Sequence, residues 1–176
     1  MIFSDVVIRE AVAADLPALH ALIERGYRGD SARVGWTHEA DLLGGQRTDV
    51  AALADILADP DQRMLIAEQA GTPVGCVTLR RSGDARAYLG MLTVDPALQA
   101  KGLGRRLIDA GEVSARDWRV SAIELTVIAR RSELIAWYER RGYRLTGVRR
   151  PFPLDDPRFG LPKTRDLEFV VLQKTL

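Results

Sequence analysis

The segment from Leu92 to Arg106 constrains the fold of this chain more than any other part of the sequence. Its apolar start predicts a strand that ends at Val94, and Asp95-Pro96 breaks that strand before Gly102-Leu103-Gly104 opens a helix. Glycines at such a junction let backbone N–H groups approach a ligand, and the first turn of a helix carries partial positive charge. The segment therefore predicts an anion site suited to phosphate.

The residues around these glycines narrow the choice of phosphate ligand. A dinucleotide-binding fingerprint needs a third small residue where this chain has Leu107, and a nucleoside triphosphate loop needs a Gly-Lys-Ser/Thr run that the chain lacks. A lone Gly-x-Gly is as consistent with a sharp structural turn and solvated arginines as with a ligand site. Three flanking cations would reinforce anion binding: Lys101, Arg105 and Arg106.

Composition excludes several classes of protein. The chain has 176 residues, of which 47% are hydrophobic and 28% are charged, so we expect a single globular domain over residues 1–176. With 25 Lys and Arg against 24 Asp and Glu, the net charge of +1 argues against a nucleic-acid-binding protein. One cysteine and two histidines exclude an internal disulfide and a Cys/His zinc site, so no metal is expected.

The chain also lacks the marks of export or membrane insertion. Its start, MIFSDVVIRE, has neither the basic flank nor the long apolar stretch of a secretory signal. The longest uncharged run, Gln69 to Leu79, has 11 residues, well short of the ~18 that a membrane-spanning helix needs. We therefore expect a cytoplasmic protein that binds no membrane, and the sequence leaves a homodimer open.

Hydrophobic periodicity and turn residues predict elements in the order βααβββαβαββ. Hairpin-linked strands precede strand–helix–strand crossovers, so the predicted fold is α/β, with a mixed sheet covered by helices on both faces. Two segments show no periodicity, residues 27–48 and the proline-rich residues 149–166. The predicted strands are residues 6–9, 64–68, 74–80, 86–94, 122–128, 143–147 and 167–172, and the predicted helices are residues 15–26, 49–58, 102–118 and 132–141.

Two motifs on these elements resemble a known family. Gln99-x-x-Gly102-x-Gly104 after a strand resembles the pyrophosphate loop of the GCN5-related N-acetyltransferases, the GNAT superfamily. Further on, A-W-Y-E-R-R-G-Y (Ala136 to Tyr143) resembles the second signature of that superfamily, a Tyr-Glu pair before a glycine and an aromatic. The predicted element order matches as well. The resemblance covers most of the chain and implies a GNAT-like acyl-CoA N-acyltransferase fold, with acetyl-CoA as cosubstrate and an amine as acceptor.

Residue by residue, the resemblance implies a cofactor site. Arg131 and Ser132 would lie beside the cofactor, although Arg131 stands where the family often has asparagine. Tyr138 matches the position that often acts as general acid toward the departing thiolate. Backbone groups would pair with the pantetheine arm of acetyl-CoA, as an added strand would, at Leu92, Thr93 and Val94. The pyrophosphate would be held by amides and side chains of Gln99, Ala100, Lys101, Gly102, Leu103, Gly104 and Arg105.

The chemistry sets what each group must do. An alkylamine of pKa ~10.4 must lose a proton before it attacks a thioester, and the leaving thiolate resembles a thiol of pKa ~8.5. A tyrosine of pKa ~10 stays protonated at neutral pH and is able to donate, and backbone N–H groups near Thr93 and Val94 are candidate donors to the oxyanion. The alternative for Tyr138 is a packing role, because Leu134 lies one helical turn before it.

No general base is assigned from the sequence. The histone-modifying branch of the family uses a strand glutamate at the position of Tyr88, so the resemblance places Tyr88 on the acceptor side without a proton-accepting role. Four carboxylates are possible substitutes, and ordinary surface charge is the favoured interpretation of each: Glu24, Glu39, Asp41 and Glu124.

The acceptor pocket is expected from the loops. In the family, the connection between the last two strands lies beside the acceptor end of the cofactor channel, so Phe152, Tyr27 and Trp36 are expected to wall that pocket. Arg149 or Arg150 would then favour an acceptor that carries a carboxylate. The alternative is that the proline-rich segment braces a sheet edge and touches no substrate.

Three functions follow from these features. The first is an acetyl-CoA-dependent N-acetyltransferase acting on a small-molecule or peptide amine. The second is a non-catalytic acyl-CoA-binding sensor or scaffold. The third is an interaction protein that docks through residues 149–166, with the glycine turn purely structural.

Overall fold

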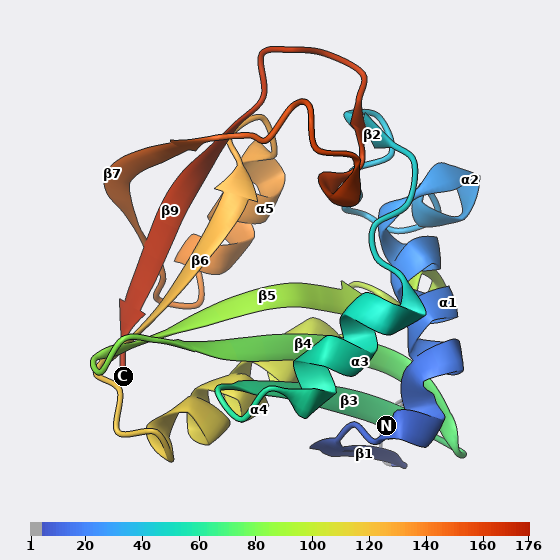
Figure 1. Cartoon of the computed structure of the whole chain (residues 1–176), viewed down its shortest axis with the longest axis vertical. Helices are drawn as coiled ribbons and strands as arrows, with labels where there is room; N and C mark the ends of the chain where they lie inside the picture. Colours follow the sequence, from blue (N-terminus) through green and yellow to red (C-terminus); the bar gives the residue numbers. More distant parts are fainter. Residues whose placement is uncertain (1–4) are drawn as a thin grey trace.

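The computed structural model describes residues 5–176, so residues 1–4 of the N-terminal stretch considered above lie outside the described residues. Within this part of the chain, a seven-stranded sheet has the order β1-β3-β4-β5-β6-β9-β7, and β2 and β8 pair as a separate ribbon (Figure 1). The strands are β1 (Val6–Glu10), β2 (Leu43–Gly44), β3 (Gln62–Gln69), β4 (Thr72–Ser82), β5 (Arg86–Val94), β6 (Ala122–Ile128), β7 (Arg144–Pro151), β8 (Leu161–Pro162) and β9 (Glu168–Thr175). The helices are α1 (Leu16–Tyr27), α2 (Gly29–Ala32), α3 (Val50–Ala58), α4 (Leu103–Arg116) and α5 (Ser132–Glu139), with single 3₁₀ turns η1 (Ala13–Asp15), η2 (Pro96–Leu98) and η3 (Pro157–Phe159).

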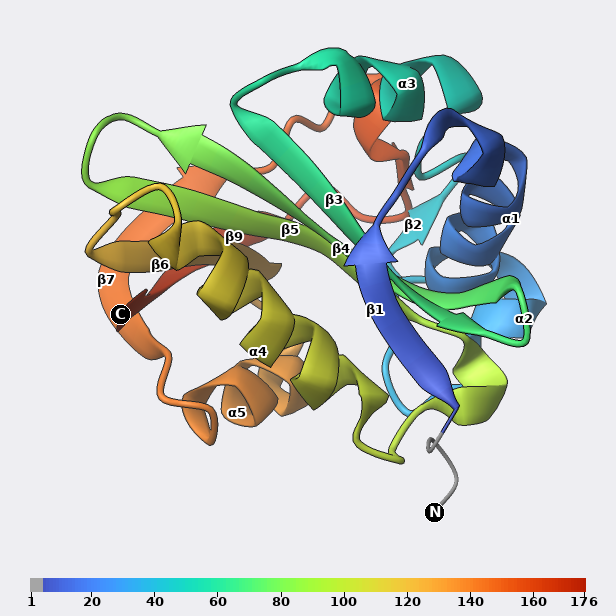
Figure 2. The same cartoon turned by 90° about the horizontal axis from the view of Figure 1, so that it is seen from below.

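The predicted α/β class and the main element order βααβββαβαββ are confirmed by this architecture. The β5–β6 pair is parallel and the other pairs of the large sheet are antiparallel, so the sheet is mixed as expected. Helices α4 and α5 lie on one side of the sheet, and α1 and α3 lie on the other (Figure 2). None of the helices in residues 5–176 has the length and apolar character needed to cross a bilayer.

Strand β3 shows why the sheet can be covered on both faces. Successive side chains of a strand point to opposite faces. Met64 and Ile66 therefore pack with α1 and α3, while Leu65 and Ala67 pack in the larger cluster on the α4 side. Cys76 on β4 lies fully buried on the α1 side, where burial raises the pKa of its thiol to about 12. A continuous apolar run is what such a two-sided environment requires.

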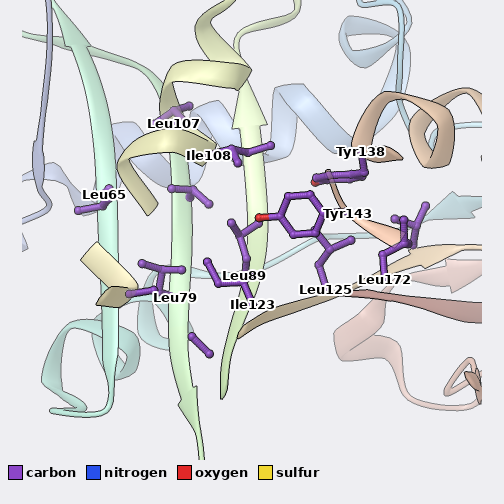
Figure 3. Packing of buried hydrophobic residues seen from close by; sticks show 14 of the residues in the cluster. Leu65, Leu79, Leu89, Leu107, Ile108, Ile123, Leu125, Tyr138, Tyr143 and Leu172 are labelled. Carbon is purple, nitrogen blue, oxygen red and sulfur yellow. The ribbon is translucent and has the colours of Figure 1, made fainter. Parts of the chain in front are cut away.

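Helix α4 packs its apolar side chains against the other face of the sheet. Its hydrophobic stripe includes Leu107 and Ile108, which lie over Leu79 and Leu89 of the sheet (Figure 3). Gly111 sits over the same leucines, where a Cβ would lie 3.6 Å from Leu89 Cδ1, so the helix approaches the sheet closely. This packing fixes the helix whose N-terminus bears the glycines.

The unpatterned segments contain more structure than their sequence indicates. Strand β7 runs on to Pro151, so Arg149 and Arg150 belong to a strand and not to the loop. A register shift between Leu145 and Arg149, with Gly147 at φ +82°, breaks the alternation that would have marked the strand. Similarly, β2 and β8 are short and become strands only by pairing across the fold.

Strands β5 and β6 are paired only at one end. The parallel register joins residues 86–88 to residues 122–124, after which the two strands part (Figure 1). Tyr88 stands at the parting, where its hydroxyl lies 2.6 Å from Thr126 Oγ1. Beyond it, a register shift between β4 and β5 and a positive φ at Met91 turn the strand. Among the described residues, no strand pairs with the edge of β5 that faces β6 from Leu89 to Val94.

Candidate active site

A cavity of about 720 Å³ opens where β5 and β6 separate. It runs from the start of α4, past the unpaired edge of β5, to side chains of β6, α5 and β9 and of the segments 27–48 and 152–159. One continuous space therefore joins the glycine junction, the open strand edge and the loops. Of the residues expected from the sequence, it is lined by Tyr27, Trp36, Tyr88, Leu92, Thr93, Val94, Gln99, Ala100, Gly102, Gly104, Arg105, Arg131, Tyr138 and Phe152.

The glycine junction has the form of an anion site. Gly102 caps α4 with φ +92°, and no atom lies within 4 Å of where its Cβ would stand. Gly104 faces Trp137, whose Cζ2 atom would lie 3.4 Å from an added Cβ. Bare backbone at the start of a fourteen-residue helix presents free N–H groups and the positive end of the helix dipole.

The cations near the junction differ in position. Arg105 is exposed at the rim of the cavity and lies 3.7 Å from Asp109, and Lys101 is exposed and donates to the Ala97 carbonyl at 3.5 Å. Arg106 instead donates to the Val6 carbonyl at 2.9 Å, on the side of β1. Leu103 turns its side chain into the core, so only its backbone faces a ligand. Ser132 is exposed at the first turn of α5.

Tyr138 lies in the wall of the cavity with its hydroxyl free. Its ring packs edge-on against Trp137 at 5.1 Å and Tyr143 at 5.6 Å, and the residue is 6% exposed. No hydrogen bond joins its hydroxyl to any residue in the described part of the chain. Burial is the largest cause that raises the pKa of this phenol, followed by the neighbouring Tyr27, so the proton stays on the oxygen at neutral pH. The ring is packed, and the hydroxyl remains available.

The expected acceptor-pocket residues do not all meet. Tyr27 donates from its hydroxyl to the Leu92 carbonyl at 2.9 Å, which ties the end of α1 to the open edge of β5. Phe152 packs on Phe169 at 5.1 Å, at the loop end of the cavity. Trp36 instead stacks on Trp137 at 6.2 Å, near the glycine junction. Trp36 and Phe152 both line the cavity, but they contact different partners, so a common acceptor wall stays a prediction.

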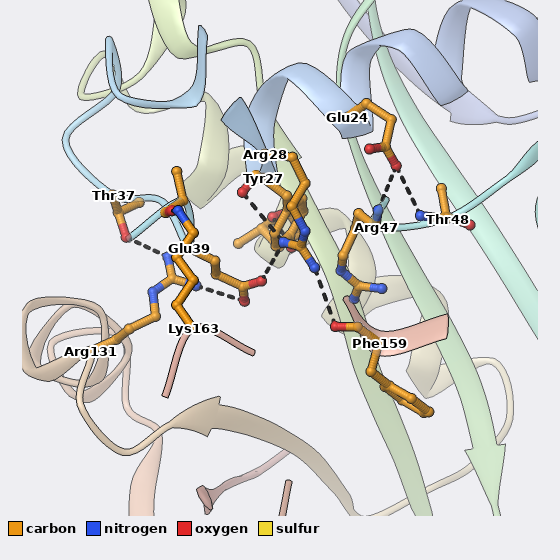
Figure 4. Close-up of polar contacts among 12 residues, drawn as sticks. Glu24, Tyr27, Arg28, Thr37, Glu39, Arg47, Thr48, Arg131, Phe159 and Lys163 are labelled. Atoms are coloured by element: carbon orange, nitrogen blue, oxygen red, sulfur yellow. Dashed lines mark hydrogen bonds and ion pairs between the residues drawn. The ribbon is translucent and has the colours of Figure 1, made fainter. Parts of the chain in front are cut away.

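The sequence reasoning missed a buried ion cluster between the loops. Glu39 accepts a hydrogen bond from Arg28 at 2.8 Å and from Arg131 at 3.0 Å, and Arg131 also donates to Thr37 Oγ1 at 2.6 Å (Figure 4). Arg28 further donates to the Phe159 carbonyl at 3.3 Å. This Arg28–Glu39–Arg131 cluster joins three segments, and it engages the Arg131 guanidinium that was expected beside the cofactor. The only sequence signal for it was an arginine where the family often has asparagine.

Two arginines expected to bind an acceptor carboxylate are paired elsewhere. Arg149 forms an ion pair with Glu168, and Arg150 forms one with Glu124 at 2.6 Å. Both are exposed on β7, and neither lines the cavity. The expected role of Arg149 or Arg150 toward a carboxylate is therefore corrected: their charges are satisfied by neighbouring strands.

The candidate bases are also engaged. Glu24 accepts from the backbone N–H groups of Arg47 and Thr48 at 2.8 and 2.9 Å, which holds the start of α3. Asp41 pairs with Arg33 at 2.8 Å on the surface. Burial alone would raise the pKa of Glu39, but the charges of its arginine neighbours outweigh burial and hold that pKa below its usual range. Glu124 is paired with Arg150, as above, so none of the four is a free carboxylate.

No group of three or more histidine, cysteine or acidic side chains is gathered for a metal ion anywhere in residues 5–176.

Sequence comparison places this arrangement among known proteins. Residues 20–143 match the Acetyltransferase (GNAT) family. The chain is 35% identical over 88 residues to mycothiol acetyltransferase of Propionibacterium freudenreichii and 33% identical over 101 residues to IAA acetyltransferase of Azospirillum brasilense. These matches cover 48% and 56% of this chain. They span 28% of the first relative and 65% of the second, less than two thirds of either.

Solved structures agree in fold. The ribosomal-protein-S18-alanine N-acetyltransferase of Escherichia coli superposes with a TM-score of 0.71 at 19% identity, over 97% of this chain and 93% of that one. The protein yncA of Salmonella typhimurium, solved with its cofactor acetyl-CoA, superposes with a TM-score of 0.72 at 23% identity, over 98% and 95%. At these identities the likeness is one of architecture.

Proposed function

Because the chain belongs to the GNAT family of acetyltransferases, we propose that it transfers an acetyl group from acetyl-CoA to an amine by direct attack in a ternary complex, with Tyr138 as general acid. The observation that carries the proposal is the single cavity that joins the glycine junction, the unpaired edge of β5 and the free Tyr138 hydroxyl. Each of these three features answers one requirement of the reaction.

The residues present fit acetyl-CoA. Gly102 and Gly104 leave a backbone cradle that a Cβ would fill, which suits the pyrophosphate, with Arg105 at its rim. The β5 edge at Leu92–Val94 offers hydrogen-bonding groups to an extended chain with amides, such as the pantetheine arm. When bound, acetyl-CoA supplies the thioester that carries the acetyl group. We assign cofactor binding to the predicted set, with Lys101 and Ser132 as exposed contacts and with Arg131 in the cavity lining, where Glu39 and Thr37 hold its guanidinium.

Tyr138 would hold the proton that the departing sulfur needs. Its raised pKa keeps the phenol protonated, and its hydroxyl has no competing partner in the described chain. A phenol is a weaker acid than a thiol (ordinary pKa values ~10 and ~8.5), so the hydroxyl first donates a hydrogen bond to the sulfur as negative charge develops there. Holding amine and thioester together provides much of the remaining acceleration, roughly 7–11 kcal/mol in well-oriented systems.

A second function has one observation in its favour. All four carboxylates considered as general bases are engaged in ion pairs or backbone hydrogen bonds, which is compatible with an acyl-CoA-binding sensor that performs no transfer. The free hydroxyl of Tyr138 favours the enzyme.

The test is CoA binding by calorimetry together with thiol release from acetyl-CoA during incubation with a panel of amines. Binding with amine-dependent thiol release supports the transferase. Binding without thiol release from any amine supports the sensor, and no binding contradicts both. In that last case the protein would use residues 149–166 for docking, or the fold for another purpose.

A further inference from the structure

The acceptor end of the cavity has more positive than negative charge. Among the described residues that line the cavity, Glu39 is the one carboxylate. It is shared by Arg28 and Arg131, so the cluster has two cations for one anion. The lining also includes four further arginines: Arg47, Arg80, Arg105 and Arg141. Of these, Arg47 lies over the ring of Tyr27, and Arg105 and Arg141 lie toward the glycine junction and Trp137.

The guanidinium of Arg47 forms no salt bridge with any carboxylate in the described part of the chain. It lies over the face of Tyr27, 5.0 Å from the ring centroid. Glu24 Oε1 accepts hydrogen bonds from the backbone N–H groups of Arg47 and Thr48, so the backbone of Arg47 is fixed while no salt bridge within the described residues holds its guanidinium. Figure 4 draws Arg47 with this single interaction, from its backbone nitrogen.

This free charge lies beside the reactive edge of the sheet. The ring under Arg47 belongs to Tyr27, whose hydroxyl donates to the Leu92 carbonyl on the unpaired edge of β5. Arg47 also acts electrostatically on Glu39 and on Cys76, whose sulfur contacts the Met91 carbonyl at 3.7 Å. The cation thus lines the same cavity as the strand bend, and this cavity is also lined by the aromatic rings of Phe152, Phe159 and Phe169.

We propose that the acceptor is an amine that also carries a carboxylate, as a free amino acid does, and that Arg47 binds this carboxylate. The inference rests on the proposed function. A guanidinium and a carboxylate form paired, charge-assisted hydrogen bonds, and an apolar surrounding strengthens them. A polyamine or other purely cationic acceptor would meet like charge from Arg47 and from the Arg28–Glu39–Arg131 cluster.

The same charge distribution suits the chemistry. Nearby positive charge disfavours the ammonium form of an amine, which raises the fraction of neutral nucleophile. A site of this kind depends less on a carboxylate base, and it matches the finding that the four candidate bases are engaged. The three phenylalanines lining this end favour an amino acid with an apolar side chain.

The experiment pairs each apolar amino acid with its own amide and methyl ester as acceptors. The amine of an ester or amide is less basic than that of the free acid, so it is intrinsically the more available nucleophile at neutral pH. A preference for the free acid therefore reports recognition of the carboxylate. The variants are Arg47→Gln and, as a matched control on the same loop, Arg33→Gln, which removes an arginine paired with Asp41 on the surface.

We expect thiol release to be fastest with free amino acids. In Arg47→Gln the acceptor KM should rise roughly 10- to 100-fold, the effect of a lost hydrogen bond to a charged group, while the KM for acetyl-CoA and the activity on esters stay the same. Arg33→Gln should match the parent. Calorimetric binding of the amino acid to the CoA complex should be lost in Arg47→Gln alone, which gives a readout independent of turnover.

Two results would overturn the inference while leaving the proposed function intact. One is thiol release from uncharged amines with none from amino acids. The other is equal use of acids and esters that Arg47→Gln does not change. If the protein binds CoA but no amine causes thiol release from acetyl-CoA, the transferase function is contradicted instead. In that case the calorimetric comparison still decides whether Arg47 binds carboxylates.

Discussion

The end of the cavity at the start of α4 is built mainly from one contiguous stretch, residues 92–105, whose glycines leave backbone groups bare. The end beside Glu39 and Phe152 is built from side chains of segments far apart in the chain. Arg131 and Glu39 are 92 residues apart in sequence, and Lys163 and Ala40, joined by a hydrogen bond, are 123 apart. One end is therefore specified by a local motif, and the other exists only once the whole chain has folded.

This difference predicts how each end tolerates change. A backbone site depends on the absence of side chains, so adding atoms should harm binding while leaving the fold intact. A side-chain site held by buried charges depends on every partner, so removing one charged partner should lower the stability of the fold before it affects binding. Tyr138 stands between the two, on α5, and serves both.

The largest expected effect is at Tyr138, which lies between the two ends of the cavity. Tyr138→Phe keeps the ring that packs on Trp137 and Tyr143 and removes only the hydroxyl. The turnover rate should fall roughly 10²- to 10⁴-fold, the usual range for a lost acid–base group, while CoA affinity stays nearly the same. Steady-state kinetics and calorimetry measure the two quantities. Because the pKa of Tyr138 is raised, the parent should show no loss of activity from this group below about pH 10.

The matched control for that variant is Tyr143→Phe. Tyr143 is also buried, but its hydroxyl donates to Glu112 at 3.2 Å inside the core. Its loss should lower stability by about 1 kcal/mol and leave turnover unchanged. Equal turnover in Tyr138→Phe and the parent, with chemistry shown to be rate-limiting, would make Tyr138 a packing residue.

At the acceptor end, a substitution should first lower the stability of the fold. Glu39→Gln leaves Arg28 and Arg131 buried with a neutral partner, and breaking a buried ion pair costs about 3–5 kcal/mol. Chemical denaturation at neutral pH measures this loss. Asp41→Asn is the control, because its carboxylate is 69% exposed and pairs with Arg33 on the surface, where such pairs contribute about 1 kcal/mol or less.

The same variant has a definite pH dependence. The pKa of Glu39 is lowered in the folded protein, so its contribution to stability is present above the unfolded pKa of about 4.3 and is lost as pH falls through the folded value. The stability difference between the parent and Glu39→Gln should thus be constant near neutral pH and shrink in acid. A difference that grows in acid would contradict the assigned ion cluster.

The contrast between the two ends also explains what the sequence could predict. The main strand and helix order, the glycine junction and the place of Tyr138 follow from local patterns, in which strand alternation and helix spacing act over a few residues. The extent of β7 was missed because a bulge at Gly147 interrupts its alternation. The ribbon of β2 and β8 was missed because two-residue strands carry no period.

The acceptor end was hard to predict for the same physical reason. Whether an arginine binds a ligand depends on which acids lie near it in the folded chain. Arg149 and Arg150 are adjacent to the predicted pocket in sequence, yet Glu168 and Glu124 neutralise them across the sheet. Arg47 attracted no attention in the sequence, yet it lines the cavity over the ring of Tyr27 and forms no salt bridge with a carboxylate of the described residues.

At the cofactor end, a substitution should first lower the affinity for CoA. Gly104→Val adds a branched side chain where a Cβ already lies 3.4 Å from Trp137, and the extra methyl groups would cover the backbone that faces the ligand. CoA affinity should fall roughly 10- to 100-fold, since hydrogen bonds to charged groups are worth about 1.5–3 kcal/mol. Calorimetry measures the affinity.

Gly104→Ala is the control: it makes an ordinary contact with Trp137 and favours the helix by about 1 kcal/mol, so stability should hold while affinity falls less. Unchanged affinity in a folded Gly104→Val protein would refute the placement of the pyrophosphate.

The smallest expected effect lies at Phe152, where the acceptor wall and the core coincide. Phe152 packs on Phe169 in a cluster with Leu43 and Leu167, and it also lines the cavity. Phe152→Leu keeps most of the apolar volume and removes the flat ring, so stability should fall by about 1 kcal/mol. If the ring walls the acceptor pocket, the acceptor KM should rise several-fold while the KM for acetyl-CoA stays fixed, because this cluster includes none of residues 92–105. A lower melting temperature with both KM values unchanged would instead identify the residue as bracing for the β2–β8 ribbon. The acceptor end would then be defined by its charges and not by its aromatic wall.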